Sequence, residues 1–72
     1  MTRDEMRAWE PDPKATIFEL RYHYCGMSGT RKVLKCPISA RVAVHAFADD
    51  FKVQCLTVIP IGPDGRPMES AA

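Results

Sequence analysis

Apolar and polar residues alternate most clearly along residues 16–25. Phe18, Leu20, Tyr22 and Tyr24 share one parity, and Glu19, Arg21 and His23 separate them. A period of two that includes aromatic residues is typical of a strand with one buried face. The pattern therefore predicts a strand over residues 16–25. We expect its tyrosines on the core face with their hydroxyls at the rim.

The next segment predicts a hairpin. Two glycines within residues 25–29 indicate a loop of moderate length, and residues 30–36 predict a second strand. Leu34 and Cys36 are expected to face the core from this strand. Pro37 lacks a backbone donor and is expected to end the strand.

A helix and a third strand complete the pattern. Ser39 is a favourable N-cap, so we expect a helix over residues 40–49. Its apolar stripe comprises Ala40, Ala43, Val44, Phe47 and Phe51. Residues 52–61 form a nearly continuous apolar run, which predicts a strand that is buried at least partly on both faces.

The order ββαβ predicts an α+β fold. We expect a three-stranded antiparallel sheet with strand order 2-1-3 and one helix packed on one face. The domain would span residues 14–62, after an N-terminal arm over 1–13 and before a C-terminal tail over 63–72. In the tail, residues 66–68 are a candidate fourth strand.

The arm at residues 1–13 contains a candidate short helix. Thr2 and Glu5 have the spacing of a capping box, and Pro11 and Pro13 would end any helix. Two alternatives remain for the arm: Trp9 docks on the body, or the arm is mobile. For Trp9 itself we expect a lid over the thin core, and the alternative is an anchor for a partner.

Composition limits the classes of function. The 72 residues are 46% apolar and 26% charged, with a net charge of +1. These values are typical of one globular domain, and the charge is not that of a protein held to nucleic acid by bulk attraction. A chain this short has a thin core, so self-association is a further expectation. The charged N-terminus and the odd count of three cysteines indicate a cytoplasmic protein with reduced thiols, without a secretory signal or a membrane span.

Cysteine and histidine residues offer little for catalysis or metal binding. His23 and Cys25 share a strand face and are candidates for a reactive thiol or a zinc site, but no paired-ligand spacing is present. Cys36 and Cys55 are expected to be small core residues. His45 lies opposite the apolar stripe and is expected to be exposed without a special role. We therefore expect no enzyme activity, no cofactor and no metal.

One helix on three strands leaves a second sheet face open. This face is expected to carry Glu19, Arg21, His23, Arg31, Val33 and Lys35, with Gln54, Leu56 and Val58 as further candidates. The candidate binding residues are Arg21, His23, Arg31, Lys32, Lys35 and Trp9. A protein partner is the first expectation for this surface. The alternative is a small nucleic-acid-binding regulator that uses the same basic residues.

Four segments together resemble a recurring type of small protein. They are Phe18–Tyr24, the basic second strand, the start of the helix at Ser39–Ala43, and Val53–Val58. The combination is similar to small ββαβ accessory proteins of phages and other mobile elements, anti-CRISPR proteins among them. The resemblance implies an inhibitor or adaptor that acts on host machinery, and it assigns no site residue.

Overall fold

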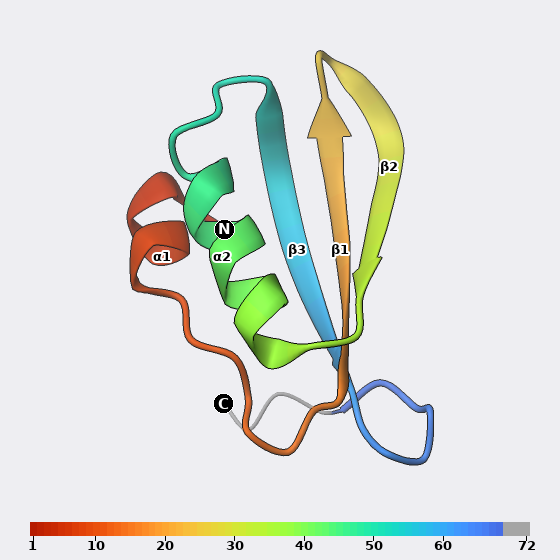
Figure 1. Cartoon of the computed structure of the whole chain (residues 1–72). Coiled ribbons are helices and arrows are strands. Elements are labelled where there is room, and N and C mark those ends of the chain that lie inside the picture. The colour runs from red at the N-terminus through yellow and green to blue at the C-terminus, as the bar shows by residue number, and fades with distance from the viewer. Residues whose placement is uncertain (69–72) are drawn as a thin grey trace.

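The computed structural model describes residues 1–68 and contains two helices and three strands (Figure 1). In chain order these are α1 (Arg3–Ala8), β1 (Ile17–Tyr24), β2 (Met27–Leu34), α2 (Pro37–Phe47) and β3 (Val53–Ile61). The strands form one antiparallel sheet in the order β2-β1-β3. The predicted fold class and strand order are therefore confirmed. Within residues 1–68, no helix is long and apolar enough to cross a membrane.

The hairpin between β1 and β2 is tighter than predicted. β2 begins at Met27, so only Cys25 and Gly26 form the turn, with φ of 53° and 80°. Positive φ at both central residues matches the two-residue turn that fits the twist of paired strands. The expected loop over 25–29 was wrong, because Gly29 lies within β2, where the register with β1 shifts between Tyr22 and Tyr24.

Helix α2 begins earlier than predicted. Its N-cap is Cys36 and not Ser39, and Pro37 takes the first helical turn, where its missing N–H costs nothing. The helix ends at Phe47, before two aspartates that suit the negative end of a helix poorly. Phe51 therefore lies beyond the helix and is 86% exposed, so its assignment to the apolar stripe was wrong.

The N-terminal arm is docked on the body. The capping box of Thr2 and Glu5 is present, and Met6 is buried. The Trp9 ring packs edge-on against Phe18 with 5.8 Å between ring centroids, which supports the lid alternative. His45 is half-buried, and its Nε2 lies 2.8 Å from the Trp9 carbonyl oxygen, so the expectation of an exposed His45 without a role was wrong.

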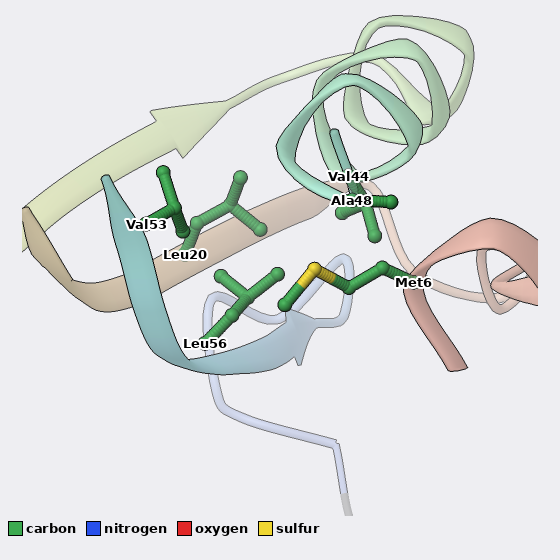
Figure 2. Close-up of a cluster of buried hydrophobic side chains, with 6 residues drawn as sticks. All are labelled: Met6, Leu20, Val44, Ala48, Val53 and Leu56. Carbon is green, nitrogen blue, oxygen red and sulfur yellow. The ribbon is translucent and has the colours of Figure 1, made fainter. Parts of the chain in front are cut away.

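The core lies between the sheet and the two helices. Figure 2 shows its larger cluster, in which Met6 of α1 points toward residues of α2 and of the sheet. The members of this cluster are Met6, Leu20, Val44, Ala48, Val53 and Leu56. A second, smaller cluster consists of Ala15, Phe18 and Ala40. Since both helices contribute to the same core, they cover the same face of the sheet (Figure 1).

A bulge in β3 decides which of its side chains face the core. Arg21 pairs with Thr57 and His23 with Gln54, so β3 has one residue more than β1 in this interval. Cys55 has a φ of 56°, the left-handed conformation that bulges often require. Because of the extra residue, Val53 and Leu56 are both buried although their parities differ. The predicted placement of Leu56 and Val58 on the open face was wrong, since Leu56 is buried in the core and half-buried Val58 packs against it.

The chain after β3 folds back along the end of that strand. Ile61 forms an isolated bridge with Pro67, and the Met68 N–H donates to the Pro60 carbonyl. The candidate fourth strand is therefore a single bridge. The remainder of the predicted tail, residues 69–72, lies outside the described residues.

Candidate functional site

The sheet face opposite the helices carries the candidate site, and we call it the open face. Side-chain alternation and the strand register place on it Glu19, Arg21 and His23 of β1, Arg31 and Val33 of β2, and Gln54, Cys55, Thr57 and Ile59 of β3. Arg21 lies at the centre of this face, because it pairs with Arg31 on one side and with Thr57 on the other.

Glu19 is a buried carboxylate on this otherwise accessible surface. Its side chain is 7% exposed, whereas those of Arg21 and Arg31 are 61% and 63% exposed. The Nε of Arg21 donates to one carboxylate oxygen at 2.8 Å, and the Nε of Arg31 forms an ion pair with the other at 2.5 Å. One carboxylate thus holds two guanidinium groups from neighbouring strands, which we call the arginine pair.

The terminal nitrogens of the arginine pair take no part in the contacts with Glu19. Both contacts with Glu19 use the Nε atoms, and within residues 1–68 no ion pair involves the Nη atoms of Arg21 or Arg31. Guanidinium Nη groups match the two oxygens of a carboxylate in a planar, bidentate geometry. The terminal nitrogens of the arginine pair therefore match the geometry of a carboxylate or similar anionic group.

A shallow hollow of about 560 Å³ adjoins the arginine pair. Arg21, Arg31 and His23 line it together with small and apolar residues of the three strands. Its remaining lining residues are Tyr22, Gly29, Thr30, Cys55, Thr57 and Ile59. A hollow lined by both charged and apolar groups can orient a partner through the charges and bury one of its side chains.

The predicted site residues fall into two groups. Arg21, His23 and Arg31 lie together on the open face. Lys32 alternates with the open-face residues of β2 and therefore lies on the face that the helices cover, where its side chain is exposed. Lys35 follows the end of β2. Trp9 packs against both core clusters from the helix side, so the structure separates it from the arginine pair.

The three cysteines are all free and exposed. The expectation that Cys36 and Cys55 lie in the core was therefore wrong: Cys36 precedes α2, and Cys55 occupies the β3 bulge. The backbone amides of Ser39 and Ile38 at the start of α2 lower the pKa of the Cys36 thiol, because they favour its anionic form. Among residues 1–68, no three His, Cys, Asp or Glu side chains are grouped so that they could hold a metal ion.

The structure adds residues that the sequence analysis did not single out. Glu19 was placed on the open face, but its burial between two arginines was not foreseen. Its position two residues before Arg21 on one strand face was the signal, because such side chains are neighbours. Thr57 and Ile59 were missed because their exposure depends on the bulge at Cys55.

Comparison of the chain with protein-family models, with curated proteins and with solved structures finds no match. The relationship to phage and mobile-element proteins therefore stays a prediction.

Proposed function

We propose that this chain is a non-catalytic protein-binding module whose docking surface is the open face. The observation that carries the proposal is the buried Glu19 between Arg21 and Arg31. A carboxylate that holds two long side chains in place reduces the conformational entropy that those side chains lose when a partner binds. Arginine is also among the residues that contribute most to binding at protein interfaces.

The same carboxylate favours a protein over a nucleic acid. Two arginines with Glu19 carry one net positive charge at the centre of the face, and the whole chain carries +1. A surface that binds a phosphate backbone gains from each uncompensated cation, and a central carboxylate opposes that gain. A protein partner with a few acidic groups and an apolar side chain for the hollow fits this charge and shape better.

An inhibitor or adaptor that acts on host machinery, in the manner of an anti-CRISPR protein, would use such a surface. Such a protein would block a site on its partner by binding alone and would need no catalytic group of its own. The self-association expected from the small size of the chain is the competing use of the same face.

The test is affinity capture from a bacterial lysate with the tagged protein, with and without nuclease. Three forms are compared: wild type, Arg21→Glu on the open face, and Arg41→Glu on α2 as a control with the same change of charge. We expect a stoichiometric protein that survives nuclease and is retained by wild type and by Arg41→Glu, but lost with Arg21→Glu. Loss of all bound material after nuclease treatment, or equal capture by the three forms, would contradict the proposal.

A further inference from the structure

The two edges of the sheet differ. The outer edge of β3 is occupied at three carbonyls: the Met1 ammonium donates to that of Leu56, Arg3 donates to that of Val53, and the Met68 N–H donates to that of Pro60. Pro60 also lacks an N–H of its own. By contrast, within residues 1–68 no hydrogen bond reaches the backbone of β2 from outside the sheet. Figure 1 shows β2 as the outer strand on the side away from α1.

The backbone groups of β2 that point outward belong to Arg31 and Val33. In β3, core-facing Leu56 and Val53 direct their carbonyls away from β1, toward their partners in the N-terminal arm. β2 runs in the same direction as β3 on the opposite side of β1. Its core-facing residues therefore direct their N–H and C=O groups toward β1, and its open-face residues direct theirs to the free edge.

The free edge is basic, which opposes pairing between two copies. Residues 27–36 contain Arg31, Lys32 and Lys35 and no acidic residue. Two antiparallel copies of β2 would place these cations beside one another, and like charges across a strand pair are destabilising. Exposed lysines on an edge strand also discourage indiscriminate pairing. The same charges favour an extended segment that carries carboxylates.

We propose that the partner of this module adds an acidic, extended segment to the free edge of β2 as a fourth antiparallel strand. The proposal rests on the proposed function and specifies how the partner docks. Opposite residues in paired strands are neighbours on the same sheet face. The incoming strand would therefore place a carboxylate opposite Arg31, a second carboxylate opposite Lys32 on the other face, and a β-branched apolar residue opposite half-exposed Val33.

The probe is the peptide acetyl-Thr-Thr-Val-Glu-Glu-Val-Thr-Thr-amide. In an antiparallel arrangement its first valine lies opposite Val33, its first glutamate opposite Lys32, and its second glutamate opposite Arg31. The measurement is amide hydrogen exchange of the isotope-labelled full chain by NMR, as peptide is added at low salt. We expect exchange of the Arg31 and Val33 amides to slow roughly tenfold near saturation, because these N–H groups become hydrogen-bonded.

Two N-methylated peptides provide a matched pair that leaves the protein unchanged. Methylation of the first valine and the second glutamate removes the N–H groups that would face β2, and we expect binding to be lost. Methylation of the first glutamate and the second valine removes N–H groups on the far side, and we expect binding within about threefold of the parent peptide. In the protein, Val33→Pro removes one outward donor while the ladder to β1 is kept, and binding should weaken about three- to tenfold.

The outcomes separate the docking mode from the proposed function. Equal loss with both methylated peptides, equal binding of a peptide with lysine in place of glutamate, or unchanged exchange at Arg31 and Val33 would each overturn strand addition. If partner capture is nonetheless lost with Arg21→Glu and kept with Val33→Pro, the open face binds protein without adding a strand. If capture is insensitive to Arg21→Glu, the proposed function itself is wrong.

Discussion

Substitution of Glu19 tests whether this carboxylate organises the open face. Glu19→Gln keeps the shape of the side chain and one oxygen, so one arginine keeps its acceptor and the other faces an amide N–H. Both arginine side chains are more than half exposed and can turn to water, which limits the loss. A hydrogen bond to a charged group contributes about 1.5–3 kcal/mol, and an exposed ion pair about 0.2–1 kcal/mol. For this partly buried contact we expect a loss of about 1–2 kcal/mol.

In a domain of this size, that loss lowers the midpoint of thermal unfolding by about 4–16 °C. The assay is thermal and urea unfolding followed by circular dichroism. Glu10→Gln is the control, because Glu10 pairs with Arg41 at 3.2 Å with both side chains more than half exposed. We expect that control to cost less than about 1 kcal/mol. Equal midpoints for Glu19→Gln and Glu10→Gln would refute the assignment of Glu19 as the residue that holds the arginine pair.

Glu19→Leu separates stability from function. A buried ion pair that is replaced by an apolar residue of similar volume often leaves stability unchanged or higher. Glu19 pairs with Val33 and Ile59 in the neighbouring strands, so a leucine would pack between apolar side chains. We expect Glu19→Leu to be at least as stable as wild type, yet to capture less partner, because the arginines lose their common acceptor. A variant that is stable and captures partner normally would show that the orientation of the arginines is unimportant.

Three further predictions concern residues outside the arginine pair. His45→Ala removes the hydrogen bond to the Trp9 carbonyl and should cost about 1 kcal/mol, seen as lower stability and faster proteolysis of the arm; unchanged proteolysis would show that the arm is held otherwise. Among single-cysteine forms, the one that keeps Cys36 should reach its half-maximal rate of alkylation by iodoacetamide at the lowest pH, because the pKa of this thiol is lowered; identical pH profiles for the three cysteines would contradict this. Cys55→Gly should raise the free energy of unfolding by about 0.5–1 kcal/mol by relieving the positive φ, whereas Cys55→Val should lower it; the opposite order would argue against the bulge.

The strand order and the sheet face that the helix covers could be predicted from the sequence, because each depends on a pattern within a single segment. The alternation over residues 16–25 and the helical spacing after Ala40 leave few arrangements for so short a chain. The exact register did not follow. It depends on the turn at Cys25 and Gly26, where a cysteine takes a positive φ that asparagine, aspartate or glycine more often adopts.

An unsignalled positive φ at a cysteine also explains the wrong predictions for β3. A bulge with a left-handed residue is usually signalled by glycine at that position, and here Cys55 occupies it without any such signal. Without the bulge, Leu56 and Val53 cannot both face the core, so sequence parity alone assigns one of them to the wrong face. To predict the burial of Glu19, the positions of both neighbouring arginines must be known. These positions also depend on the register between β1 and β2.

The sequence contains a signal for the start of α2, but the prediction assigned that signal to the end of β2. The sequence pattern predicts that Pro37 ends the preceding strand, although proline is also favoured in the first turn of a helix. The two interpretations agree about where β2 stops and differ about where α2 starts. As a result Cys36, expected in the core of a longer strand, became the exposed N-cap of the helix.

The claim that the open face is the docking surface is tested most directly by photo-crosslinking in living bacterial cells. A photoreactive phenylalanine is placed either at Thr57, on the open face beside the hollow, or at Val42, on the exposed side of α2. We predict a discrete adduct of higher mass with a protein, resistant to nuclease, from position 57 and not from position 42. An adduct from position 42 alone, or a nuclease-sensitive product from position 57, would contradict the account.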